Sequence, residues 1–190
     1  MRIDVGKART KLPRIMRAAV ELFVEKGIDG TTTRDISKRA GVALGGLYRH
    51  FKTKDDLAHA IFRENVAELA ALLFAAVRPN RPLERNLEAL VGCLFEEYER
   101  DPILARFVLF GQFREMPRLP PGFRYPSDAF AEALRHACER GEVEAKEIPL
   151  LSAMTFGAAV RATVFRAHGA LPDLRTLTKE VARRCARMTR

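Results

Sequence analysis

Apolar side chains recur along almost the whole chain at the spacing of an amphipathic α-helix. The first such helix has apolar residues at positions i, i+3, i+4, i+7 and i+8, namely Ile15, Ala18, Ala19, Leu22 and Phe23. Pro13 suits the first turn of this helix, and Gly27 suits its end. No run of alternating β-branched residues is long enough to predict a strand. The pattern therefore predicts an all-α protein.

The same periodicity and the breaks between periodic segments predict the later helices. A helix at about 54–77 ends where Pro79 and Pro82 follow, and another covers 83–100. Asp101 and Pro102 open the next helix, whereas 116–126 contains four prolines and a glycine and is expected to be a loop. We expect Ser127 to cap a helix that ends near residue 140, and two final helices at about 148–168 and 173–188.

Residues 30–57, GTTTRDISKRAGVALGGLYRHFKTKDDL, are the most informative stretch. Thr32 followed three residues later by Asp35 resembles a capping box at a helix start. Gly41 closes that helix where the chain must turn sharply, because glycine accepts a positive φ without steric cost. A second short helix is predicted at about 44–50. Two short helices joined by a tight glycine turn have the geometry of a helix-turn-helix.

The positive charge is concentrated in the same part of the chain. The protein has 33 Lys and Arg against 24 Asp and Glu, a net charge of +9. Residues 1–54 hold 13 basic and 5 acidic side chains, a balance of +8, whereas 55–190 hold 20 and 19, a balance of +1. The residues expected to face outward near the turn are cations and hydrogen-bond donors suited to phosphate oxygens: Arg34, Lys38, Arg39, Tyr48, Arg49, His50, Lys52 and Lys54. A basic helix face is usually only a solvated surface, but here it coincides with the turn glycine and its spacing.

AGVALGGLYRHFKTKDDL, preceded by TTTRDISKRA and by a helix ending in Gly27, resembles the DNA-binding region of the TetR family of bacterial transcriptional regulators. The resemblance covers about residues 12–60. It implies an N-terminal three-helix helix-turn-helix domain, at 1–54, and a C-terminal helical effector-binding and dimerisation domain, at 55–190.

The resemblance also implies DNA-contacting roles by position. Phosphate contacts are implied for Thr32, Thr33, Tyr48, His50 and Lys54, and approach to the bases for Arg34, Leu44, Gly45, Gly46 and Tyr48. The chain departs from the family pattern at Ala43, where a serine-type cap is common, and at Leu44 and Gly46, where polar residues are common. Losing the cap removes an acceptor worth about 1 kcal/mol. We hypothesise that Arg34 and Tyr48, with an apolar contact from Leu44 to a thymine methyl, supply most base discrimination, and that DNA shape supplies the rest.

Eight of the 15 aromatic residues fall between positions 95 and 130. They are typical of a hydrophobic core and equally of an aromatic-lined cavity between helices. Because the resemblance implies a ligand-responsive C-terminal domain for a small apolar effector, the pocket candidates are Tyr98, Phe107, Phe110, Phe113 and Phe130.

The last two predicted helices carry an apolar seam. Leu174, Leu177, Val181, Cys185 and Met188 recur at spacings of 3, 4, 4 and 3, and Phe156, Gly157 and Val160 offer a further apolar face on the preceding helix. The pattern alone fits packing within the chain as well as packing between two chains. TetR-like proteins dimerise through their two final helices, so the resemblance favours a homodimer interface formed by these eight residues.

Other classes of protein find little support in the sequence. The four histidines show no metal-binding spacing, no GxSxG, Walker-type or GxGxxG motif occurs, and three unpaired cysteines do not suggest a disulfide scaffold. The first residues show no signal peptide, and the longest uncharged, mostly apolar run has 13 residues, which is short for a membrane span. We therefore expect a cytoplasmic protein with no catalytic residues, no metal and no cofactor.

The sequence predicts a dimeric, ligand-released repressor that binds a palindromic operator in double-stranded DNA. Two alternatives stay open: a nonspecific DNA-binding protein without an effector, and a small helical carrier or enzyme for a hydrophobic molecule. If specific DNA outcompetes bulk DNA at physiological salt, the protein is a specific repressor and not a nonspecific DNA-binding protein. DNA affinity that depends on salt favours the repressor over a carrier or enzyme. The sequence identifies neither the effector, the operator nor the regulated genes.

Overall fold

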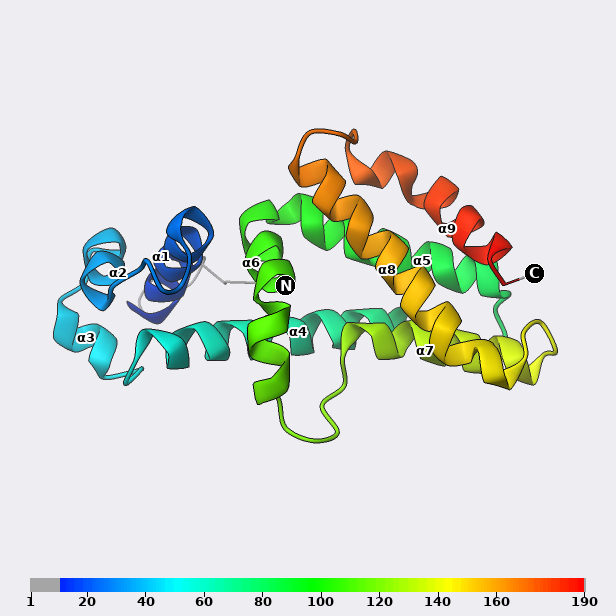
Figure 1. Ribbon diagram of the computed structural model, residues 1–190, viewed down its shortest axis with the longest axis horizontal. Helices are drawn as coiled ribbons and strands as arrows, with labels where there is room; N and C mark the ends of the chain where they lie inside the picture. The colour runs from blue at the N-terminus through cyan, green and yellow to red at the C-terminus, as the bar shows by residue number, and fades with distance from the viewer. Residues whose placement is uncertain (1–10, 190) are drawn as a thin grey trace. The chain divides into compact units, whose positions relative to one another are not determined.

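The computed structural model describes residues 11–189 apart from the side chain of Phe110, and in this range the chain is helical with no β-strand (Figure 1). The α-helices are α1 (Lys11–Lys26), α2 (Thr33–Ala40), α3 (Leu44–Tyr48), α4 (Lys54–Ala76), α5 (Leu83–Arg100), α6 (Pro102–Glu115), α7 (Pro126–Glu139), α8 (Ile148–Ala167) and α9 (Thr178–Arg187). Short 3₁₀ helices lie at Met116–Arg118, Ala145–Glu147 and Leu174–Leu177. The predicted all-α fold class is confirmed.

Three local predictions need correction. The cap of α7 is Tyr125 and not Ser127, because Pro126 occupies the first turn with its preset φ, and Asp128 accepts the Tyr125 backbone N–H at 2.7 Å. The segment predicted as loop from 116 begins with a 3₁₀ turn. The last predicted helix is divided, since Asp173 caps a 3₁₀ helix before α9 begins at Thr178.

The described chain divides into two compact units that are interleaved in sequence. One contains 11–65 and 103–121, and the other contains 66–102 and 122–189. Helix α4 runs from the first unit into the second, and α6 lies almost wholly in the first. The functional division predicted between residues 54 and 55 stays a prediction.

In the first unit the apolar faces of α1 to α4 bury a shared core. Ile15, Ile36 and Leu47, one from each of the first three helices, are fully buried. The Phe23 ring of α1 stacks on Phe107 of α6, with ring centroids 5.7 Å apart. The core therefore holds the two short helices of the predicted helix-turn-helix on a support made by α1, α4 and α6.

In the second unit, α5 packs against α9, and α7 packs against α8 (Figure 1). The α5 carboxylate of Glu99 accepts hydrogen bonds from the Arg166 guanidinium of α8 and from the backbone N–H of Leu174, both at 2.9 Å. Burial disfavours the charged carboxylate, but the hydrogen bonds from Arg166 and Leu174 outweigh it and lower the Glu99 pKa. One carboxylate thus joins three elements of this unit.

Candidate nucleic-acid interface

Helix α2 begins with the predicted capping box. The Thr32 hydroxyl accepts the Asp35 backbone N–H at 3.1 Å, and the Asp35 carboxylate accepts the Thr32 backbone N–H at 3.0 Å. Lys26 at the end of α1 donates to the same carboxylate at 2.8 Å. The hydrogen bond from Lys26, followed by those from Thr32, holds the Asp35 pKa far below its usual range. The start of α2 is therefore fixed both locally and to α1.

The turn between α2 and α3 depends on Gly41. Its φ is 63°, in the left-handed region, and the following residue, Val42, donates its N–H to the Ser37 carbonyl at 3.0 Å. A Cβ at Gly41 would lie 2.6 Å from a guanidinium nitrogen of Arg14. The turn glycine predicted from the sequence is confirmed in both conformation and position.

Helix α3 is short and only weakly stabilised by its own sequence. Ala43 stands at its N-cap and provides no side-chain hydrogen bond, as the sequence predicts. Leu47 anchors the helix in the core, whereas the neighbouring Tyr48 is 49% exposed. A Cβ at Gly45 or at Gly46 would meet no heavy atom within 4 Å, so the space beside this helix is open.

Four cations of the predicted surface have no hydrogen-bond or ion-pair partner among residues 11–189. They are Arg34, Lys38, Arg49 and Lys52, and all are exposed. His50 is exposed beside them. Unpaired guanidinium and ammonium groups keep their donors available, so this surface can bind phosphate oxygens without first breaking contacts within the protein.

Three other predicted residues already have partners inside the protein. Arg39 forms a bidentate pair with Glu25, at 2.9 Å for both hydrogen bonds, which raises the Arg39 pKa. Lys54 donates to the carbonyl oxygens of Asp29 and Thr31 at 2.9 and 3.0 Å, so it holds the turn before α2 and has one N–H left. Thr33 hydrogen-bonds the Tyr48 hydroxyl at 3.2 Å, which joins α2 to the exposed ring of α3.

Sequence reasoning missed the residues that brace this surface from behind. Arg114 of α6 donates to Asp29 at 3.1 Å and also pairs with Asp55 at the start of α4. Buried Glu115 accepts from His59 at 2.9 Å and from Arg118 at 3.0 Å. These partners are 56 to 85 residues apart in some cases, so no local spacing signals them.

The described residues contain no cluster of three or more His, Cys, Asp and Glu side chains able to hold a metal ion. Burial raises the pKa of the Cys93 and Cys185 thiols, which lowers the fraction of reactive thiolate.

A comparison with known families identifies the part of the chain that carries this surface. The sequence model described as "Bacterial regulatory proteins, tetR family" matches residues 15–61, which include most of α1, all of α2 and α3, and the start of α4. The chain is 33% identical over 127 residues to the HTH-type transcriptional repressor Rv3405c of Mycobacterium tuberculosis. Residues 15–61 therefore carry the helix-turn-helix region of the TetR family. The match covers 65% of this chain and 65% of the Mycobacterium relative, slightly less than two thirds of that relative's length.

Solved structures agree with this TetR-family fold over nearly the whole chain. A regulatory protein of the tetR family from Rhodococcus RHA1 has a TM-score of 0.80 at 22% identity and covers 95% of this chain and 97% of its own. FadR from Bacillus subtilis, solved in complex with stearoyl-CoA, has a TM-score of 0.68 at 22% identity and covers 91% and 96%. At these identities the likeness establishes the fold.

The predicted pocket residues lie in different parts of the chain. Tyr98 and Phe130 are buried in the second unit, where the Phe130 ring meets Phe156 edge-on at 5.4 Å. Phe107 is buried in the first unit, whereas Phe113 in the same unit is 87% exposed. Phe110 lies outside the described side chains. The expectation that these five residues line one pocket stays a prediction.

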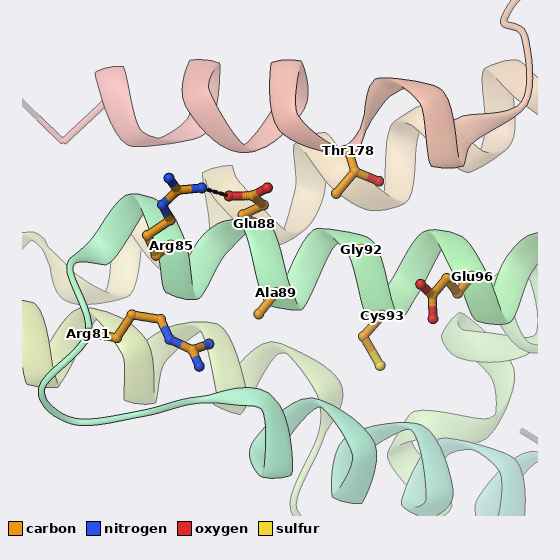
Figure 2. A pocket seen from close by; sticks show the side chains of 8 residues that line it. All are labelled: Arg81, Arg85, Glu88, Ala89, Gly92, Cys93, Glu96 and Thr178. Atoms are coloured by element: carbon orange, nitrogen blue, oxygen red, sulfur yellow. Dashed lines mark hydrogen bonds and ion pairs between the residues drawn. The ribbon is translucent and has the colours of Figure 1, made fainter.

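The second unit has an open groove of about 570 Å³ along α5 (Figure 2). Figure 2 shows Arg85 paired with Glu88 on the side of α5 that faces Thr178, whereas the Cys93 side chain points away from Thr178. Among the four predicted aromatic residues whose side chains the structure describes, none lines it. Its charged lining does not match the apolar effector that the sequence predicts.

The predicted dimer residues separate into buried and accessible groups. Leu174 and Cys185 are buried within the chain itself, because α9 and the preceding 3₁₀ helix pack on α5. The accessible members are at least partly exposed: Phe156, Gly157, Val160, Leu177, Val181 and Met188. Leu174 and Cys185 therefore lie in the core of the described chain, and the homodimer interface stays a prediction.

Proposed function

We propose that this chain is a DNA-binding transcriptional regulator of the cytoplasm that represses by occupying a palindromic operator as a homodimer and is released by an apolar effector. We assign it no enzymatic activity. The observation that carries the proposal is the exposed set of unpaired cations around α2 and α3, with Arg34 and Lys52 as its members on either side of the turn. The family membership and the repressor named among its relatives support the same function.

Helix α3 is suited to enter the major groove closely. Five residues at about 1.5 Å each make it short, and Gly45 and Gly46 add no side chains that would keep its backbone away from DNA. Few side chains are then left for direct base readout, so we assign base discrimination to Arg34, Tyr48 and Leu44, as hypothesised above. DNA shape contributes the remaining specificity.

Selection from a randomised duplex pool tests this function. The expected result is enrichment of a palindrome whose half-sites lie about one helical turn apart, because a twofold dimer presents two copies of α3. Fluorescence anisotropy then compares the selected operator with random DNA at several salt concentrations. Equal affinity for both would favour the nonspecific DNA-binding alternative, and the absence of salt-dependent binding would favour a carrier or enzyme.

Arg34→Ala tests whether Arg34 contacts the DNA bases or only positions the protein on the phosphate backbone. We expect a loss of about 1–3 kcal/mol on the operator and a smaller loss on random DNA, because a base contact is lost only on the operator. Arg63→Ala is the control, since Arg63 is an exposed α4 arginine of the same unit and lies outside α2 and α3. An equal loss on both DNAs would assign Arg34 to phosphate positioning alone.

The homodimer is supported by an uncovered apolar face on α8. Leu150 is 65% exposed, Met154 is 41% exposed and Phe165 is 46% exposed, and Gly157 is exposed between them. By length and composition, Ala145–Ala167 also qualifies as a possible membrane span, with 28% of it buried within the protein. We assign this face to a second copy of the chain, because a palindromic operator requires two copies of α3 and because small residues such as Gly157 permit close helix approach.

The effector is proposed to be apolar and to bind among the helices of the second unit. The support is the stearoyl-CoA bound by the B. subtilis FadR structure and the aromatic side chains of the second unit, including Tyr98 and Phe130. A ligand releases DNA only if it binds the DNA-free conformation more tightly than the DNA-bound one. A thermal-shift screen of fatty acids and acyl-CoA thioesters, followed by operator release, tests this assignment.

A further inference from the structure

The first unit contains a second hollow that the proposed function does not use. It has a volume of about 300 Å³ and lies between the end of α1 and α6. Its lining includes Phe23, Val24, Ile28, Arg106, Phe107 and Arg114. All of them belong to the unit that carries α2 and α3.

The floor of this hollow is apolar. Phe23 and Phe107 are buried, and their rings are stacked at an interplanar angle of 25°. Val24 and Ile28 are half-buried and continue the apolar surface from the end of α1. An aromatic or aliphatic body laid on this floor would remove apolar surface from water on both sides.

The rim of the hollow carries two arginines, and the charge of one of them is not paired with a carboxylate. Within residues 11–189 no acidic side chain lines it, whereas Arg106 and Arg114 do. Arg114 is engaged by Asp29 and Asp55. Arg106 is exposed and has no hydrogen-bond or ion-pair partner within residues 11–189, so its guanidinium can bind an anionic group.

We propose that this α1–α6 hollow binds a small amphipathic monoanion, with a flat apolar body on Phe107 and Phe23 and a carboxylate on Arg106. A volume of about 300 Å³ is at the lower end of the range for small-molecule sites, which suits a body of about two fused rings and excludes a long acyl chain. The site differs in both place and ligand class from the effector site proposed above.

The hollow is built on the segment that positions α2. Gly27 lines it, and the Gly27 carbonyl accepts the Thr31 hydroxyl at 2.7 Å just before α2 begins. The adjacent Lys26 is the residue that pairs with Asp35 in α2. Binding here is independent of the proposed function, but where both hold, occupancy and operator affinity are expected to influence one another by equal factors.

Methyl NMR of the full-length protein, titrated with 2-naphthoate in the absence of DNA, tests the site. We expect saturable shifts at the Ile28 and Val24 methyls, with a dissociation constant in the millimolar range or tighter, as is usual for a ligand of about 13 heavy atoms. The uncharged analogue 2-naphthylmethanol should bind about tenfold more weakly, because it cannot pair with Arg106.

Two variants and one control locate the binding. Arg106→Gln should weaken 2-naphthoate about tenfold, and Val24→Trp should abolish the shift at Ile28 by filling the hollow. Arg63→Gln, an exposed arginine on α4 that does not line the hollow, should leave binding unchanged. Unchanged methyl signals from Val91 and other residues of the second unit show that each variant is folded.

The proposal is overturned if Ile28 and Val24 show no saturable shift, or if the shifts occur only at second-unit methyls such as Val91. It is also overturned if the Arg106→Gln variant binds 2-naphthoate as tightly as the wild-type protein does. The same holds if the wild-type protein binds 2-naphthylmethanol as tightly as 2-naphthoate. Since the titration contains no DNA, failure of the regulator function would leave these outcomes unaffected, and failure here would leave operator binding unaffected.

Discussion

At the scale of single residues, the site is fixed by short-range hydrogen bonds and by backbone conformation. The Thr32 and Asp35 pair satisfies donors that the first turn of α2 would otherwise leave free. Gly41 takes a left-handed conformation that other residues adopt at a cost. Gly46, by contrast, has no positive φ and no neighbour at its missing Cβ, so nothing within the described fold requires a glycine there.

Gly41→Ala and Gly46→Ala form a matched pair. We expect Gly41→Ala to lower the free energy of unfolding by about 1–2 kcal/mol, because alanine is strained at φ 63°. We expect Gly46→Ala to raise it by up to about 1 kcal/mol, because alanine is the better helix former and its methyl meets open space. Urea unfolding measures both. An equal effect of the two changes would contradict the role assigned to the turn.

The carboxylate of Asp35 makes the folding stability of the first unit depend on pH. Its pKa in the folded protein is far below the ordinary value, chiefly because Lys26 hydrogen-bonds to it. A lowered folded pKa stabilises the fold fully above the unfolded pKa of about 3.9, and that stabilisation is lost progressively as the pH falls below it.

Asp35→Asn should therefore destabilise the protein more at pH 7 than at pH 3. Denaturant unfolding at both pH values measures the difference. Glu64→Gln, at an exposed α4 position in the same unit, is the control and should show a smaller change with pH. The same destabilisation at both pH values would mean that the Asp35 charge does not contribute.

At the scale of elements, a short recognition helix is held by longer helices behind it. Helix α3 has five residues and no side-chain cap, so its position depends on Leu47 in the core and on the Thr33–Tyr48 contact with α2. An isolated helix of this length would not be stable in water. Helices α4 and α6 complete the support, and buried Glu115 joins them through His59.

Glu115→Ala should loosen the contact between α4 and α6. Losing hydrogen bonds to a buried carboxylate is expected to lower the free energy of unfolding by about 1.5–3 kcal/mol. Thermal and urea unfolding check the value, with Glu64→Ala on the exposed side of α4 as the control. A loss no larger than that of the control would show that the His59 contact contributes little.

At the scale of the whole molecule, the exposed apolar face of α8 determines the expected assembly. Leu150, Met154 and Phe165 would remain in water in a single chain, and monomeric proteins rarely leave a continuous apolar stripe uncovered. A twofold contact through this face also provides the two copies of α3 that a palindrome requires.

Met154→Glu should convert the dimer into a monomer. Placing a charge in an apolar interface leaves it desolvated and unpaired, so sedimentation should give a mass near 21.4 kDa in place of twice that value. Leu72→Glu, at an exposed apolar position on α4, is the control and should leave the dimer intact. A Met154→Glu dimer would move the interface to another surface.

The sequence alone determined the features that depend on neighbours in the chain. Helix spans, the capping box at Thr32, the turn at Gly41 and the concentration of positive charge before residue 55 follow from spacings of three or four residues and from composition. The tertiary structure decided which of those residues remain available. Arg39 and Lys54 are engaged by α1 and the turn that follows it, and Leu174 and Cys185 are buried by α5 packing on the C-terminal helices. A periodic pattern states that a helix face is apolar or charged, but only the long-range packing of other helices specifies what covers that face.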